Sequence, residues 1–155
     1  MKTYKEFYKY ANKLALKWRY CKKQIIEKLI LKNADDKTVN RIIKQLSDEK
    51  ILDDSRAFEI DIFILEEKRY GFYRIKQYLL NKGYQKSLVD SYIFNKDIEI
   101  DNCCFHFTKA SRKYKNYRYI ESEKEKLINY LKRYGFNDKI IYEVIKAGIN
   151  YENVK

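Results

Sequence analysis

Proline is absent from this 155-residue sequence, and glycine occurs only four times. β-Sandwiches and hairpin-rich barrels need both residues at their many tight turns, so this composition argues against those folds. A glycine-rich phosphate loop is also excluded, because Gly71, Gly83, Gly135 and Gly148 lie too far apart to form one. The composition is instead typical of a helical protein.

Groups that support catalysis are also scarce. Histidine occurs once, at His106, and cysteine three times, at Cys21, Cys103 and Cys104. Two of these cysteines are close to the histidine, but a closed zinc site needs four ligands and the sequence has no CxxC pair. We interpret Cys103, Cys104 and His106 as buried residues on a helix face. No Ser/His/Asp set and no phosphate-loop lysine is present, so we expect a protein that is not an enzyme, with no catalytic residue, metal or cofactor.

Long apolar runs are missing too. No segment approaches the roughly 18–20 apolar residues that a membrane span requires. The N-terminal sequence MKTYKEFYKYANKLALKWRY is charged throughout and lacks the apolar stretch of a signal peptide. An odd number of cysteines without framework spacing fits a reducing compartment. These features predict a cytoplasmic protein that makes no membrane contact.

The sequence does contain an internal repeat. RYCKKQIIEKLILKN, which begins at Arg19, aligns with RYGFYRIKQYLLNKG, which begins at Arg69; YLLNKGY, from Tyr78, aligns with YLKRYGF, from Tyr130. Repeats of this length usually form stacked helical arrays in which neighbours complete each other's cores. We therefore predict an all-α fold of three tandem three-helix repeats in an elongated, curved array. Their expected bounds are residues 1–50, 51–97 and 98–155.

The second repeat shows the expected helix pattern. Asp54 is the predicted N-cap of its first helix, with a first-turn charge beside it; a paired-carboxylate metal site at Asp53 and Asp54 is the alternative. The apolar residues of this helix recur every three or four positions, at Ala57, Phe58, Ile62 and Leu65.

The later helices of each repeat have predicted ends and inward faces. A left-handed residue is expected to end the second helix, at Asn33, Gly83 and Gly135 in turn. A short third helix is expected over residues 86–94. The residues predicted to face inward in these helices are Ile75, Tyr78, Leu79, Leu88, Val89, Tyr92 and Ile93 in the second repeat, and Leu127, Tyr130, Leu131, Tyr134, Ile140, Ile141, Val144 and Ile145 in the third.

Basic residues interleaved with tyrosines are the main candidate binding feature. Lysines and arginines number 34 against 22 acidic residues, which gives a net charge of +12. The segment KASRKYKNYRY supplies cations for phosphates and ring faces for stacking. A solvated helix end in a lysine-rich protein is the alternative. The candidate residues are Lys109, Arg112, Lys113, Lys115 and Arg118 in this segment, Lys68, Arg69, Arg74 and Lys76 at an earlier turn, and Lys132 and Arg133 before Gly135.

These motifs together resemble the RecX family, regulators of the RecA recombinase. The resemblance rests on the order of several short motifs over nearly the whole chain. They are Leu46, Asp53-Asp54, Ala57-Phe58, Gly71, Arg74-Ile75, Leu79 and Lys82-Gly83, then Lys126-Leu127 and Arg133-Tyr134-Gly135-Phe136, with WRYCKKQIIEKL as the first-repeat motif. Two departures are present: Ala57-Phe58 inverts the family's aromatic–alanine order, and Phe63, Ile64 and Leu65 stand where the family usually has basic residues.

The resemblance implies a function that the residues alone do not name. A RecX protein binds the groove of the filament that RecA forms on single-stranded DNA. It suppresses ATPase and strand exchange by limiting filament growth or promoting disassembly, in DNA repair, homologous recombination and the SOS response. The expected partners are thus the RecA filament and single-stranded DNA, contacted directly or through RecA, with the chain itself a monomer. A general nucleic-acid-binding helical module without RecA dependence is the alternative.

Overall fold

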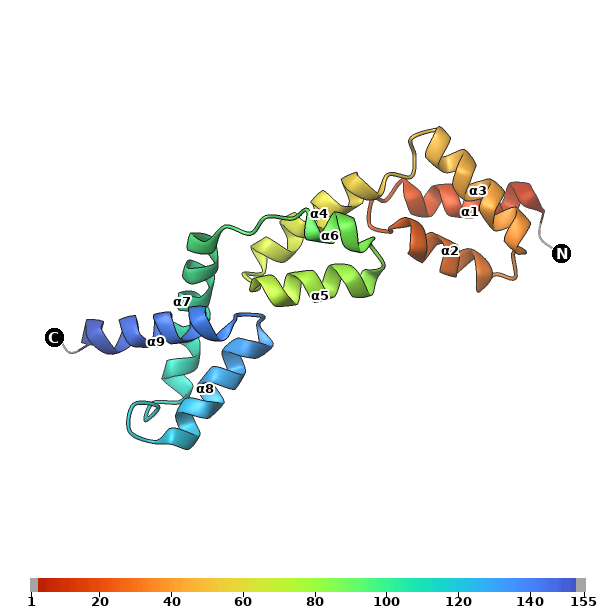
Figure 1. The fold of residues 1–155 in the computed structure, drawn as a ribbon. Coiled ribbons are helices and arrows are strands. Elements are labelled where there is room, and N and C mark those ends of the chain that lie inside the picture. Colours follow the sequence, from red (N-terminus) through yellow and green to blue (C-terminus); the bar gives the residue numbers. More distant parts are fainter. Residues whose placement is uncertain (1–2, 153–155) are drawn as a thin grey trace. The chain divides into compact units, whose positions relative to one another are not determined.

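Every regular element in the computed structural model is an α-helix over residues 3–152, the part of the chain that the structure describes (Figure 1). The all-α prediction is therefore confirmed. The helices are α1 (Tyr4–Ala15), α2 (Lys22–Ile30), α3 (Asp36–Asp48), α4 (Asp54–Glu67), α5 (Phe72–Lys82), α6 (Lys86–Asp90), α7 (Lys96–Lys113), α8 (Glu121–Arg133) and α9 (Asp138–Glu152). Within the described range, none of them is long and apolar enough to cross a membrane.

The helices are grouped into two compact units. Residues 1–64 and 78–92 form unit 1, and residues 65–77 and 93–155 form unit 2. Helices α4 and α5 contribute residues to both units, because the boundaries after residues 64 and 77 fall inside them. The division into three repeats stays a prediction.

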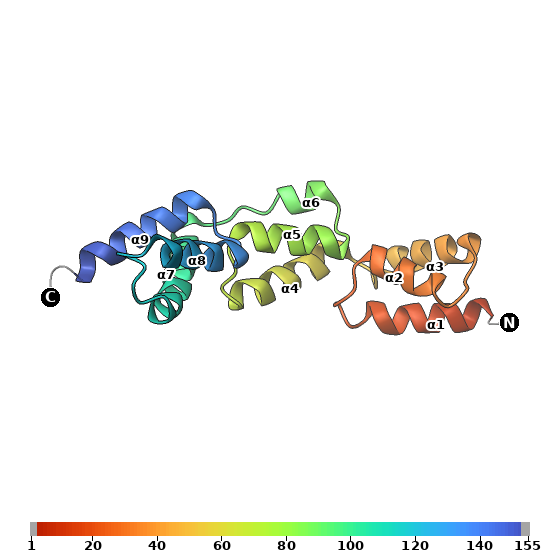
Figure 2. The same ribbon diagram turned by 90° about the horizontal axis from the view of Figure 1, so that it is seen from below.

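Unit 1 has its main core among α1, α2 and α3, which lie side by side in Figures 1 and 2. Each helix buries residues at a spacing of three or four, which places them on one face. Asp35 starts α3 as its N-cap, since its carboxylate accepts a hydrogen bond from the Thr38 backbone N–H at 2.8 Å. The core contains Phe7, Ala11, Leu14, Ala15, Ile25, Leu29, Val39, Ile42, Ile43 and Leu46.

Unit 2 has its core among α7, α8 and α9. The predicted inward residues of the last two helices are confirmed as buried: Leu127, Leu131, Ile140, Ile141, Val144 and Ile145. From α7 come Cys103 and Ala110, and Phe136 follows the end of α8. Tyr130 and Tyr134 are only partly buried and pack against the edge of this core.

Three helix ends share the predicted geometry. Asn33, Gly83 and Gly135 have φ values of 64°, 107° and 95°, in the left-handed region. After each one, a backbone N–H returns to a carbonyl near the helix end, as in the bond from Phe136 N–H to the Leu131 carbonyl at 3.4 Å. The predicted stops are confirmed.

The short helix after Gly83 was predicted too long. Helix α6 ends at Asp90, where the Ser91 hydroxyl donates to the Leu88 carbonyl at 2.7 Å and competes with helix continuation. Ile93, expected to face inward, is 90% exposed because it lies in the connection that follows. Tyr78 was also predicted inward, and its side chain is instead 46% exposed.

The paired aspartates are one helix cap and one first-turn charge, as predicted, but the cap is Asp53 and not Asp54. Asp53 caps α4, since its carboxylate accepts from the backbone N–H groups of Ser55 and Arg56 at 2.9 and 3.3 Å. Asp54 is the first residue of α4, and its carboxylate accepts from the Lys22 backbone N–H, at the start of α2, at 2.7 Å. The two carboxylates therefore serve two helix ends, one local and one distant in sequence.

Candidate functional site

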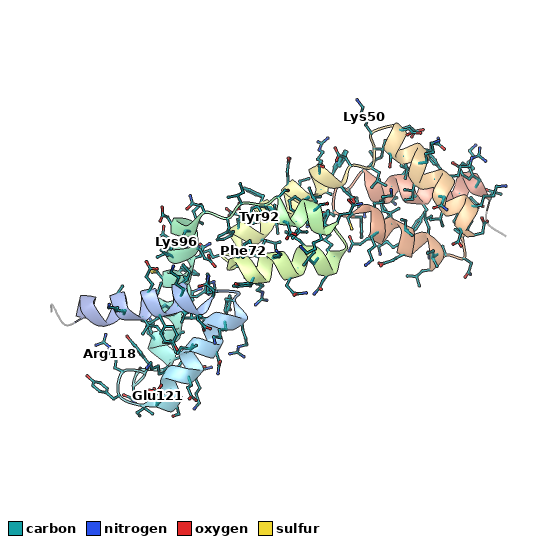
Figure 3. All side chains as sticks on the ribbon, in the orientation of Figure 1. Lys50, Phe72, Tyr92, Lys96, Arg118 and Glu121 are labelled. Carbon is teal, nitrogen blue, oxygen red and sulfur yellow. The ribbon has the colours of Figure 1, made fainter. Side chains whose placement is uncertain are left out.

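All eleven candidate binding residues lie in unit 2. They come from the connection between α4 and α5 with the N-terminal half of α5, from the C-terminal part of α7 with the connection that follows, and from the end of α8. The segment KASRKYKNYRY is not one helical stripe, because α7 ends at Lys113 and the remaining residues form turns. Figure 3 shows Arg118 on this connection and Glu121 at the start of α8.

Two glycine turns join two of these segments. The Gly71 backbone N–H donates to the Tyr134 carbonyl at 2.8 Å, and the Tyr73 N–H donates to the Gly135 carbonyl at 3.1 Å. A Cβ atom added to Gly71 would lie 2.5 Å from the Gly135 carbonyl carbon, so the backbones meet where no side chain fits. This contact fixes the turn before α5 against the turn after α8.

Arginines occupy the edge of this junction. One guanidinium nitrogen of Arg74 donates to the Arg133 carbonyl at 2.7 Å. The same guanidinium lies over the Tyr70 ring, 4.2 Å from its centroid, and 5.5 Å from that of Tyr134. Such cation–π contacts hold the charge in place while leaving it available to an anion. The structure thus brings the predicted residues Arg74 and Arg133 together.

Phe105 brings together two further candidates that are distant in sequence. The Arg69 guanidinium lies 4.3 Å and the Lys109 ammonium 4.1 Å from the centroid of its ring. Sequence analysis missed Phe105, although its position four residues before Lys109 on a helix is a signal for such a pair. A partly buried ring with two cations offers charge and an aromatic edge in one place.

His106 supports this arrangement from below the surface. It is 4% exposed, and its Nε2 lies 3.1 Å from the Arg69 carbonyl. A carbonyl only accepts, so Nε2 carries the proton and Nδ1 does not. Nδ1 is buried and has no hydrogen-bond partner. Arg69 has a φ of 55°, so the histidine holds a residue in a sparsely populated conformation.

The buried imidazole predicts acid sensitivity. Burial, as the main cause, lowers the pKa of His106, and the cations Lys109, Arg69 and Arg74 lower it further. Below about pH 6.5 the unfolded chain takes up a proton that the folded chain resists, so this residue lowers stability as the pH falls. We expect the stability advantage of the wild type over His106→Gln to be largest above about pH 6.5 and to shrink below it.

Chemical denaturation of both proteins over a pH series checks this expectation. Comparing the two removes the contribution of Glu99, whose pKa burial raises and which therefore acts in the opposite direction. A difference between the proteins that stays constant with pH would contradict the neutral, buried assignment of His106.

The remaining candidates flank two shallow hollows. Arg112, Lys115 and Arg118 line one together with Tyr117 and Tyr119, and the Arg118 Nε donates to the Tyr117 hydroxyl at 3.2 Å. Lys132 and Arg133 line the other.

The hollow at Lys132 and Arg133 adds residues that sequence analysis did not select. Tyr114, Lys126 and Asn129 complete its lining, and the Lys113 ammonium lies 5.5 Å from the Tyr114 ring centroid. Lys132 is partly neutralised by an ion pair with Asp138 at 2.7 Å, which raises its pKa. Two predicted residues remain. Lys68 is exposed, and the Lys76 ammonium lies 5.8 Å from the Phe72 ring centroid.

The described part of the chain contains no group of three or more metal-ligating side chains. Cys103 is fully buried, and burial raises the pKa of its thiol to about 12, which disfavours a nucleophilic thiolate. The residues that the structure gathers are cations and aromatic rings, an arrangement for binding acidic or nucleic-acid surfaces.

The fold and this surface define an all-helical protein whose second unit gathers cations around aromatic rings. No protein-family model matches the chain. Regulatory protein RecX of Clostridium tetani (strain Massachusetts / E88) is 32% identical over 129 residues, which cover 83% of this chain and 58% of that protein. Regulatory protein RecX of Clostridium beijerinckii (strain ATCC 51743 / NCIMB 8052) is 30% identical over 129 residues, covering 80% and 59%. The chain belongs to the RecX family.

Solved structures agree on the fold. The crystal structure of RecX from Lactobacillus salivarius has a TM-score of 0.75 over 92% of this chain and 96% of that chain, at 18% sequence identity. A second crystal structure of regulatory protein RecX has the same TM-score at 19% identity and covers 92% and 73%. The present chain spans about 58–59% of the length of the C. tetani and C. beijerinckii proteins.

Proposed function

We propose that this chain regulates RecA by binding in the groove of the RecA filament on single-stranded DNA. Bound there, it suppresses ATPase and strand exchange by limiting filament growth or promoting filament disassembly. Membership of a family whose relatives are named regulatory proteins supports the regulatory role. The chain acts as a monomer with no cofactor and no catalytic step of its own.

The gathered cations of unit 2 are the observation that carries this proposal. Arg69 and Lys109 share one aromatic ring, and the Arg74 guanidinium is bonded to the Arg133 backbone carbonyl, so each of these three charges is held in place by a ring or a backbone group. A preorganised group of cations loses less side-chain entropy on binding than scattered lysines do. It also speeds association with an acidic filament by electrostatic steering.

Charge reversal at the end of α7 tests which surface is used. Arg112 and Lys113 are exposed residues of its last turn. We expect Arg112→Glu with Lys113→Glu to weaken binding to RecA–DNA filaments by about tenfold or more, since two favourable charge contacts become repulsive. Co-sedimentation of the protein with preformed filaments measures this, and circular dichroism confirms folding.

The matched control is Lys139→Glu with Lys146→Glu on α9. It changes the net charge equally and alters exposed residues of the same unit outside the candidate surface. Equal losses in both double variants would show that net charge alone matters. Unchanged binding in the α7 variant would move the contact surface elsewhere.

Direct nucleic-acid binding without RecA is the second candidate function. The exposed ring of Tyr119, which lines a hollow with Arg112, Lys115 and Arg118, favours it, because aromatic faces next to cations suit unpaired bases. Binding to single-stranded DNA alone, with a steep salt dependence and no effect on RecA activity, would support this alternative over the first.

A further inference from the structure

Unit 1 contains a second group of cations and aromatic rings, at the connection between α1 and α2. The segment KWRYCKK, residues 17–23, has four basic residues and no acidic one. The side chains of Lys17, Arg19, Lys22 and Lys23 are all exposed. None of these residues belongs to the surface of unit 2 described above.

Trp18 is at the centre of this group. Its φ is 52°, a left-handed conformation that is rare for a bulky side chain and often marks a functional position. The Arg56 guanidinium lies 4.0 Å from the centroid of the indole ring. The ring is half-buried and Arg56 is exposed, so this stacked pair lies at the surface of unit 1.

Backbone contacts fix the two halves of the pair. Asp54, near Arg56 on α4, accepts from the Lys22 backbone N–H at 2.7 Å, and the Cys21 thiol donates to the Lys82 carbonyl at 3.2 Å. The start of α2 is therefore held against both α4 and the end of α5. The carboxylates of Asp53 and Asp54 are occupied by backbone N–H groups and do not pair with Arg56 in these contacts.

One feature of this group, a tyrosine with a cation over its ring, also occurs in unit 2. In unit 1 the connection before α2 contains Trp18, with a φ of 52°, and in unit 2 the connection before α5 contains Arg69, with a φ of 55°. A tyrosine that aligns in the two segments follows, and each has a cation over its ring: Lys28 at 5.1 Å from Tyr20, and Arg74 at 4.2 Å from Tyr70. The left-handed residues are one position apart in this alignment, and the two cations come from different positions, so the two units share only the pairing of a cation with this tyrosine.

We infer that unit 1 binds single-stranded nucleic acid at the Trp18–Arg56 pair, independently of RecA. An unpaired base stacks on the indole–guanidinium pair, and the neighbouring phosphates bind Lys17, Arg19, Lys22 and Lys23. An acidic protein surface would use the cations alone, whereas indole and guanidinium planes are the groups on which unpaired bases stack.

Intrinsic fluorescence tests this inference directly, because Trp18 is the only tryptophan in the chain. The full chain is titrated, without RecA, with oligothymidylate and with an abasic oligonucleotide of equal length. Stacking predicts quenching of Trp18 by oligothymidylate and little quenching by the abasic strand. Equal effects of the two strands would overturn base stacking. Comparable quenching by polyglutamate would show that the site takes an acidic polypeptide instead, which also overturns it.

Affinity measurements on variants complete the test. We expect Arg56→Ala and Trp18→Ala each to weaken oligothymidylate binding by about fivefold or more, because each variant removes part or all of the stacking on one base. The matched control is Arg41→Ala, which removes an exposed arginine lying 4.4 Å from the Tyr4 ring centroid near the other end of α1. Arg56→Ala leaves the core intact, so unchanged affinity in that folded variant overturns the inference. RecA is absent throughout, so the outcome does not depend on the proposed RecA regulation.

Discussion

Replacing Gly71 with alanine is expected to destabilise unit 2 by about 2–4 kcal/mol. The new Cβ would lie 2.5 Å from the carbonyl carbon and oxygen of Gly135 and 2.7 Å from a ring carbon of Phe136. Backbone atoms cannot rotate away as a side chain does, so the two turns must separate. Separation weakens the hydrogen bonds from Gly71 to Tyr134 and from Tyr73 to Gly135. Denaturant unfolding followed by circular dichroism measures the loss.

The matched control is Gly148→Ala in the same unit. There the nearest atoms to the added Cβ are ring carbons of Phe107, at 2.7 and 2.8 Å, and not backbone atoms of another segment. Alanine is also the better helix former by about 1 kcal/mol, which offsets the displacement. We expect this variant to change stability by less than about 1 kcal/mol. A Gly71→Ala protein as stable as this control would contradict the close backbone contact.

Removing the carboxylate of Asp61 is expected to destabilise unit 1 by about 3–5 kcal/mol. Asp61 forms an ion pair with Lys82, and the two side chains are only 8% and 9% exposed. It also accepts from the Tyr84 hydroxyl at 2.6 Å, and burial, with this hydrogen bond, raises the pKa of that tyrosine. Asp61→Ala leaves a nearly buried ammonium and a buried hydroxyl without their partner. Denaturant unfolding of the variant measures the effect.

Two comparison proteins separate the causes. Glu143→Ala removes an exposed ion pair with Lys96, whose side chains are 47% and 59% exposed, and should cost less than about 1 kcal/mol. Asp61→Leu with Lys82→Met removes both buried charges and should recover much of the stability lost in the single variant. If the double variant is no more stable than Asp61→Ala, the unpaired charge is not the source of the loss.

The sequence predicted local features well, because local physics determines them. The apolar spacing of α8 and α9 placed Leu127, Leu131 and Ile141 in the core, where the structure has them. The left-handed ends at Gly83 and Gly135 followed from the preference of glycine for that conformation. The end of α6 was missed because a serine hydroxyl, rather than a glycine or proline, competes with the helix there.

The details of the binding surface were harder to predict, since they depend on contacts between distant segments. The basic residues were identifiable by composition, but nothing local showed that Arg69 and Lys109 share the ring of Phe105. The same holds for the bond from His106 to the Arg69 carbonyl and for the carboxylate of Asp54 at the start of α2. These are tertiary contacts, and periodicity in one helix carries no information about its neighbour.

RecA regulation is the central claim, and the ATPase activity of RecA on single-stranded DNA tests it most directly. The chain is titrated into the reaction at ratios well below one copy per RecA. The proposal predicts strong inhibition at these ratios, because one chain in the groove stops growth of, or disassembles, a filament of many protomers. Unchanged ATPase activity, with binding of the chain to single-stranded DNA intact, would contradict the claim and favour a nucleic-acid-binding module that does not act on RecA.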